Sequence, residues 1–220
     1  MAAAGAKYYC ANQGEQMKHL LTVLLLAGSA FAGKYDKVKI TPDIAYIYVY
    51  HKGKAVKVHR IQDTKHKLTG HYAKLYRPGT YIQPVKMDPK IKTIGEVELL
   101  KFMTQKVNKK RGLLVDVRSK SAYKEESIPS AVNIPAEVKD NPAKFEKILR
   151  ILGAKRKKDG SLDTSNVLEV AFYCNGLWCS KSPDVIRRFL KAGYPADKLL
   201  YYRGGFAMWK ILGFTTVTNQ

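Results

Sequence analysis

The sequence has few of the side chains on which common reaction centres depend. It contains three cysteines, five histidines and 18 acidic residues, and no histidine follows His71. Any chemistry in the C-terminal part must therefore proceed without an imidazole that is close in the sequence. The spacing of His51, His59, His66 and His71 matches no common metal site, so we expect strand and loop histidines and no metal.

Acidic residues are too few to balance the basic ones. Lys and Arg number 39, which gives a formal net charge of +21 at pH 7. The basic residues are scattered along the chain and do not form one tail, and we detect no repeat or low-complexity tract. A basic surface of this kind favours anionic partners without specifying one of them.

A long hydrophobic segment is also absent. The apolar stretch Leu20–Leu26 is far shorter than the roughly 20 residues that span a bilayer. It follows Met17 and Lys18 and precedes the small-x-small pattern Ala30–Ala32, which is typical of a secretory cleavage site. We expect residues 1–32 to be an upstream extension and a signal peptide that starts at Met17, leaving no stable membrane span after cleavage. An uncleaved anchor is the alternative.

Export would place the mature protein in the periplasm or elsewhere outside the cytoplasm. Cys10 would be lost with the leader, and Cys174 and Cys179 would be the only remaining thiols. In an oxidising compartment, two cysteines so close in sequence can form a disulfide. We expect no nucleic acid as a partner there, so the positive charge would face an anionic envelope surface or anionic substrates.

The segment 33–92 has the composition of β structure. Ile44 to Tyr50 is rich in β-branched and aromatic residues, a turn is expected at His51–Lys54, and apolar and polar residues then alternate from Val56. This pattern predicts a hairpin. We therefore interpret residues 33–92 as a small β-rich accessory segment.

From Gly95 onward, strand and helix patterns alternate. Strands are expected at 112–117, 131–134, 167–173 and 199–202, and helices at 96–102, 142–152 and 183–191. The alternation predicts an α/β fold with a mainly parallel sheet and helices on both faces, over residues 93–220. The basic run Lys155–Lys158 is expected to be an exposed loop.

Both remaining cysteines lie in the stretch AFYCNGLWCSKSP, Ala171–Pro183. Cys174 follows an apolar strand, the position at which open α/β sheets bind ligands. Ser182 is the expected N-cap of the next helix, with Pro183 at its first position. Amides from Asn175 onward, together with the helix N-terminus, would then stabilise a Cys174 thiolate and lower its pKa without a general base.

The residues alone leave the role of the two cysteines open. Cys174 begins the loop and is the better nucleophile, whereas Cys179 is expected nearer the rim. Lys181 would supply positive charge at the mouth, with Arg187 and Arg203 as weaker candidates. The pair is a structural staple, a redox pair, or a nucleophile with its neighbour.

Four ordered landmarks over roughly residues 93–218 resemble the rhodanese homology domain. They are Asp-x-Arg at Asp116 and Arg118, the segment Ile128–Pro135, the strand-ending cysteine, and Gly204-Gly205 followed by Trp209. The loop, Cys-Asn-Gly-x-Trp-Cys-x-x-Ser-Pro, is similar to that of exported single-domain members with a short β-rich extension. In this family the loop cysteine takes up sulfane sulfur as a persulfide and passes it to a thiophilic acceptor.

The resemblance implies a sulfurtransferase or persulfide carrier with Cys174 as the catalytic residue and Cys179 as its resolving or disulfide partner. It implies an anion- or substrate-binding loop, which comprises Asn175, Gly176, Leu177, Trp178, Ser180, Lys181 and Ser182. Asp116 and Arg118 would give structural support. The expected partners are a small sulfur-containing anion or thiol acceptor and an envelope protein acceptor, and no cofactor is expected.

The chain departs from the family pattern at several positions. Glu126-Ser127 stands in place of Gly-His, Ser130 replaces the second glycine, and the loop is longer and lacks its usual arginine. The identity of the sulfur donor is therefore open. A rhodanese-fold binding or redox module with a Cys174–Cys179 disulfide is the main alternative, and a related phosphatase is a third.

Overall fold

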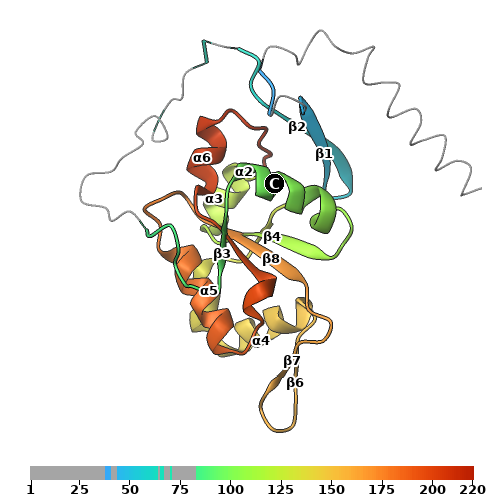
Figure 1. The fold of residues 1–220 in the computed structure, drawn as a ribbon, viewed down its shortest axis with the longest axis vertical. Coiled ribbons are helices and arrows are strands. Elements are labelled where there is room, and N and C mark those ends of the chain that lie inside the picture. The colour runs from blue at the N-terminus through green and yellow to red at the C-terminus, as the bar shows by residue number, and fades with distance from the viewer. Residues whose placement is uncertain (1–37, 41–43, 64, 67–69, 71–82) are drawn as a thin grey trace, which may run out of the picture.

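The structure is a computed structural model that describes residues 38–40, 44–63, 65–66, 70 and 83–220 (Figure 1). The expected signal peptide, its Met17 start and its cleavage site lie outside the described residues, as does part of the 33–92 segment. Among the described residues, no helix is long and apolar enough to cross a bilayer.

A five-stranded sheet forms the centre of the fold, and each pair of neighbouring strands in it is parallel. Its spatial order is β3 (Lys92–Ile94), β9 (Leu199–Tyr202), β8 (Glu169–Tyr173), β4 (Gly112–Asp116) and β5 (Val132–Asn133). The chain passes from β4 to β5 in one direction and from β8 to β9 in the other. The winding thus reverses between β4 and β8, so their carboxyl ends form the switch point at which such sheets bind ligands.

Helices cover both faces of the sheet, which confirms the predicted α/β class (Figure 1). One face carries α4 (Pro142–Ile151) and α5 (Lys181–Lys191), and the other carries α2 (Glu96–Phe102) and α6 (Gly205–Ile211). Successive side chains of a strand lie on opposite faces of the sheet: Phe172 packs with α4 and α5, and Tyr173 packs with α2 and α6. The shorter helical segments are Met103–Val107, α3 (Lys120–Glu125), Ala136–Asp140 and Ala196–Lys198.

The predicted N-terminal hairpin is present as β1 (Tyr46–His51) and β2 (Lys54–His59). Lys52 and Gly53 both have positive φ, 49° and 76°, the conformation that a tight two-residue hairpin turn requires. Val49 and Val58 are buried in the same hydrophobic cluster as α2 and α6. The proposed boundary between residues 92 and 93 falls within β3, and the division into two parts stays a prediction.

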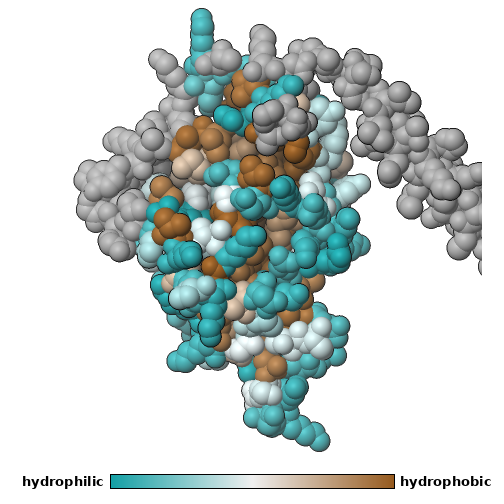
Figure 2. Space-filling model, viewed as in Figure 1, coloured by the Kyte–Doolittle hydropathy of each residue, from teal (hydrophilic) through white to brown (hydrophobic). Residues whose placement is uncertain are grey.

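The basic run at Lys155–Lys158 was predicted as an exposed loop, and this prediction was incomplete. A small hairpin forms there from β6 (Lys155–Arg156) and β7 (Leu162–Asp163). Its turn is stabilised by Asp159, whose Oδ1 accepts from the Ser161 amide at 2.9 Å, and by Gly160 at φ 81°. The hairpin is hydrophilic and lies at the lower end of the molecule in Figure 2.

Candidate active site at the cysteine loop

The cysteine loop, residues 174–180, lies at the switch point of the sheet. Cys174 directly follows β8, and α5 begins at Lys181. In the segment that follows β4, the Val117 amide donates to the Tyr173 carbonyl at 3.0 Å, so the ends of both strands are held together. The loop therefore occupies the position at which a parallel sheet presents a reactive group.

Cys174 and Cys179 form a disulfide, with their α-carbons 6.2 Å apart. Both side chains are buried, Cys174 at 3% exposure and Cys179 at 9%. Neither sulfur is a nucleophile while the bond is intact, because the thiolate is the reactive form. The structure thus contains the oxidised pair.

Helix α6 holds the first part of the loop. The Phe206 amide donates to the Cys174 carbonyl at 2.8 Å, and the Ala207 amide donates to the Asn175 carbonyl at 2.7 Å. Gly205 makes this approach possible: a Cβ at this position would lie 2.6 Å from the Cys174 carbonyl oxygen, and its φ is 62°. Gly205, the second glycine of the sequence motif, therefore allows α6 to approach the loop.

The second half of the loop is a turn that places Cys179. The Cys179 amide donates to the Gly176 carbonyl at 2.9 Å, with Leu177 and Trp178 between them. Within the described chain, the amides of Asn175, Gly176 and Leu177 donate to no acceptor. These three N–H groups therefore lie in the loop that follows Cys174 without a described acceptor.

The prediction that Ser182 caps α5 was wrong. The helix begins at Lys181 with Ser180 at the N-cap, and the Asp184 amide donates to the Ser180 carbonyl at 3.0 Å. Pro183 is tolerated inside the first turn because the first amides of a helix have no intrahelical acceptor. Ser182 is buried, and its hydroxyl has no hydrogen-bond partner within the described part of the chain.

The three cations expected near the loop are all engaged. Lys181 pairs with Glu137 at 3.0 Å and Arg187 pairs with Asp184 at 3.0 Å. Arg203 donates to the carbonyl of Gln83 from Nε at 3.0 Å and from Nη2 at 2.7 Å. The Lys181 side chain is 43% exposed and the Arg187 side chain 52%, so both ion pairs are open to solvent.

Sequence reasoning missed Tyr201, a buried phenol on β9. It belongs to the same hydrophobic cluster as both cysteines, and its hydroxyl has no hydrogen-bond partner among the described residues. Burial raises the pKa of Tyr201 to about 12, partly offset by Arg203 and Arg187, so the phenol stays protonated at neutral pH. The only sequence signal was a hydroxyl-bearing residue in a strand expected to be buried.

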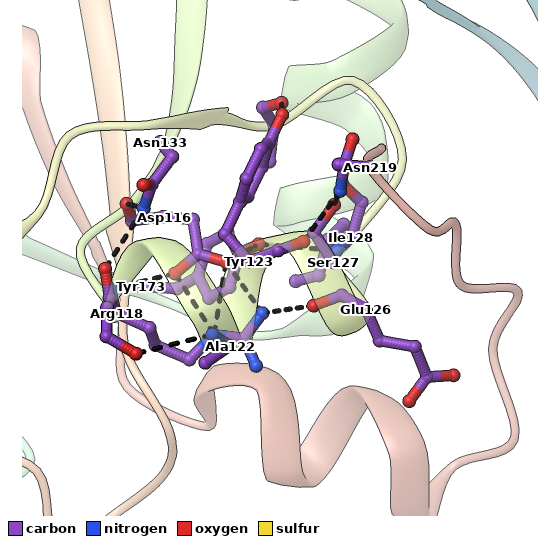
Figure 3. Close-up of polar contacts among 12 residues, drawn as sticks. Asp116, Arg118, Ala122, Tyr123, Glu126, Ser127, Ile128, Asn133, Tyr173 and Asn219 are labelled. Carbon is purple, nitrogen blue, oxygen red and sulfur yellow. Dashed lines mark hydrogen bonds and ion pairs between the residues drawn. The ribbon is translucent and has the colours of Figure 1, made fainter.

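Asp116 and Arg118 form a buried ion pair beside the loop (Figure 3). Arg118 Nη2 lies 2.7 Å from Asp116 Oδ2, and the two side chains are 2% and 0% exposed. The Tyr173 hydroxyl donates to the same carboxylate oxygen at 2.7 Å. Burial, above all, and the neighbouring Asp116 raise the pKa of Tyr173 well above its usual value, so the phenol remains a donor.

The ion pair organises the chain around it. Arg118 Nη2 donates to the Glu126 carbonyl, and the Asn133 side chain donates to the carbonyls of Asp116 and Arg118, each at 3.0 Å. The Ile128 amide donates to the Tyr173 hydroxyl at 3.2 Å (Figure 3). The ion pair and the Asn133 side chain together connect β4, β5 and the intervening segment. No set of three His, Cys, Asp or Glu side chains suitable for a metal occurs among the described residues.

Comparisons with known proteins place these features in a family context. The family model for the rhodanese-like domain matches residues 98–212. A Saccharomyces cerevisiae homolog of single-domain rhodanese and the Cdc25 phosphatase catalytic domain is 19% identical, with 62% of this chain and 94% of that chain covered and a TM-score of 0.45. No curated protein sequence matches the chain.

Two further solved structures are similar at the same level. A Bacillus halodurans protein is 21% identical, with 58% of this chain and 77% of that chain covered and a TM-score of 0.42. Thiosulfate sulfurtransferase from Pseudomonas aeruginosa is 17% identical, with 62% of this chain and 22% of that chain covered and a TM-score of 0.42.

Proposed function

Because the chain belongs to the rhodanese-like domain family, whose model matches residues 98–212, we propose that it moves sulfane sulfur through a persulfide on Cys174. One observation carries the proposal. Cys174 directly follows β8 at the switch point and begins a loop whose next three amides have no acceptor among the described residues. Such amides stabilise a thiolate or a persulfide anion.

The reaction begins with the reduction of the Cys174–Cys179 disulfide by a dithiol, which is itself oxidised to a disulfide. The Cys174 thiolate then attacks the outer sulfur of the donor. A bond forms between the two sulfurs, and the bond that held the outer sulfur breaks. Its electron pair leaves with the rest of the donor, as sulfite when the donor is thiosulfate.

Sulfur leaves the enzyme by one of two routes. A thiolate or cyanide acceptor attacks the outer sulfur of the persulfide and releases the Cys174 thiolate. Alternatively, the Cys179 thiolate attacks the inner sulfur, which forms the disulfide and expels hydrosulfide. The second route returns the loop to the state in the structure, where these two sulfurs are bonded.

Intact-mass spectrometry tests the proposal. Reduced Cys179→Ser protein incubated with thiosulfate should gain about 32 Da, the mass of one persulfide sulfur, and should form thiocyanate from cyanide. Cys174→Ser protein, the matched control, should do neither. If no donor adds sulfur to Cys179→Ser while wild type exchanges its disulfide with thiols, the sulfurtransferase proposal is wrong.

The second candidate function is a binding or redox module, and the disulfide itself favours it. In that case the protein would exchange its disulfide with the thiols of a partner and would carry no sulfur. A Cys179→Ser variant would then trap a mixed disulfide through Cys174, which non-reducing electrophoresis detects. The outcome separates the two functions.

We also propose that the protein is exported and acts on a small sulfur-containing anion or a thiol acceptor, including an envelope protein. The Met17 to Ala32 pattern and the net charge of +21 support this. N-terminal sequencing of the native protein should give Gly33 as its first residue. A chain that begins at Met1 or Met17 in a soluble cytoplasmic fraction would contradict it.

A further inference from the structure

The turn that carries Cys179 is attached to a distant part of the chain. Leu177 lies at a corner of this turn, and its carbonyl accepts from the Gln83 amide at 2.8 Å. The carbonyl of Gln83 in turn accepts two hydrogen bonds from Arg203, at 3.0 Å and 2.7 Å. The backbone of one residue therefore links the tip of the cysteine loop to the end of β9.

The two halves of the loop are held by different partners. Amides of α6 bind the carbonyls of Cys174 and Asn175, so the first half is fixed to the domain. The tip is held through Gln83, and the guanidinium that secures Gln83 belongs to Arg203, only two residues before Gly205. A guanidinium that donates twice to one carbonyl makes strong, oriented hydrogen bonds.

We infer that Arg203 is a positioning residue which, through the Gln83 backbone, holds the Gly176–Cys179 turn where Cys179 bonds to Cys174. With this link intact, Cys179 stays near Cys174 after reduction, and disulfide closure is favoured. Without this link the turn loosens, and the effective concentration of the Cys179 thiol at Cys174 falls. The equilibrium then shifts from the disulfide toward the dithiol. The positioning role of Arg203 is argued from the hydrogen bonds alone. Its consequence, how readily Cys174 becomes available to a sulfur donor, rests on the proposed function.

The test measures the thiol–disulfide equilibrium in the full chain without any sulfur donor. Arg203→Gln should lower the equilibrium constant for disulfide formation about tenfold, which raises the two-electron potential by about 30 mV. Arg203→Lys keeps the charge but loses the paired N–H donors of the guanidinium. Its equilibrium constant should lie between those of Arg203→Gln and wild type. Arg187→Gln removes a nearby positive charge that does not contact Gln83, so it should leave the equilibrium unchanged.

A second pair of variants isolates the Gln83 backbone and remains informative if Arg203→Gln does not fold. Gln83→Pro removes the amide that donates to Leu177, whereas Gln83→Ala keeps both backbone groups. The proline variant should shift the equilibrium toward the dithiol, and the alanine variant should match wild type. Unchanged potentials in Arg203→Gln and Gln83→Pro, or an equal shift in Arg187→Gln, would overturn the inference. If the potentials of the variants shift as expected but the reduced wild-type protein transfers no sulfur, the proposed function is wrong and the role of Arg203 still holds.

Discussion

Two neighbouring strands end side by side in this fold, and the segments that follow them are held in opposite ways. After β4, the segment from Asp116 to Asn133 is fixed by a buried ion pair and a chain of hydrogen bonds. After β8, the loop from Cys174 to Cys179 is fixed by a covalent bond and by hydrogen bonds to its first half and to its tip. Only the second arrangement can be opened by a change of redox state.

The two regions meet at Phe206. The Arg118 guanidinium lies 4.0 Å from the centre of its ring, while its backbone amide donates to the Cys174 carbonyl. The permanent network thus supports the residue that seats the reactive loop. The two regions therefore differ in function: the segment after β4 (the β4 side) keeps one conformation, whereas the loop after β8 (the β8 side) can open and close its disulfide.

The largest effect should come from breaking the ion pair. Arg118→Met leaves Asp116 buried without its partner, and the loss of one member of a buried pair costs about 3–5 kcal/mol of unfolding free energy. Urea denaturation measures this loss. Arg156→Met, which breaks an ion pair with about a third of each side chain exposed, should cost no more than about 1 kcal/mol. Similar losses in both variants would show that the buried network does not hold the β4 side.

A smaller effect should follow from opening the disulfide. The cysteines are five positions apart, and closure of so short a loop is worth about 2 kcal/mol in the chain-entropy model. The unfolding free energy of wild type should fall by this amount when a dithiol is added. Cys179→Ser should match the reduced wild type and should not respond to the dithiol. A loss as large as that of Arg118→Met would contradict the comparison.

Sequence patterns predicted the sheet better than the connections. The bounds of β9, Leu199–Tyr202, were predicted as observed because all four residues are apolar or aromatic and buried. Helices α3 and α6 were not predicted, because α3 buries no residue and so has no apolar face, and α6 begins after a glycine pair without a side-chain cap. The start of α5 was misplaced because Pro183 suits several positions in a first turn.

For the candidate site, the cysteines were visible in the sequence but their surroundings were not. A strand that is followed by Cys174 and then by a helix is a local pattern. The contacts of Gln83 with Leu177 and Arg203 use the Gln83 backbone, so the identity of its side chain carries no signal. Long-range backbone contacts of this kind cannot be read from a single sequence.

The β4 side also has a titratable anchor, His51 on the hairpin. It is 9% exposed, and its Nδ1 accepts from the Ser130 amide at 3.1 Å. Burial lowers the pKa of His51 below 6.5; the neighbouring Asn219 side chain opposes the shift, and the nearby charge of Lys52 adds to it. The neutral ring is therefore the form that the fold prefers.

The unfolded chain takes up a proton at His51 before the folded chain does. The contribution of His51 to stability is thus complete above pH 6.5 and decreases as the pH falls toward the lower folded pKa. His51→Gln retains an acceptor and a donor without titrating, so it should lose this pH dependence. His66→Gln, at an exposed position, is the control and should keep it. A disulfide potential that changes with His51→Gln would show that the two regions are coupled through the hairpin.

The smallest effect should come from Ser130, which replaces a glycine of the family pattern on the β4 side. Its φ is 67°, a left-handed conformation that costs a residue with a side chain about 1–2 kcal/mol. Its hydroxyl is buried, with no hydrogen-bond partner among the described residues. Ser130→Gly removes both costs and keeps the amide that donates to His51, but glycine adds freedom to the unfolded chain. We expect a net gain of about 0.5–1 kcal/mol in unfolding free energy.

Ser130→Ala separates the two contributions, because it removes the hydroxyl and keeps the backbone strain. It should gain less than Ser130→Gly in urea denaturation, and the difference between the variants measures the strain at this position. If Ser130→Ala equals or exceeds Ser130→Gly, the left-handed backbone carries no net cost and the unpaired hydroxyl explains any gain. In either case the Cys174–Cys179 potential should stay at the wild-type value, since Ser130 lies in the region that does not change its bonding.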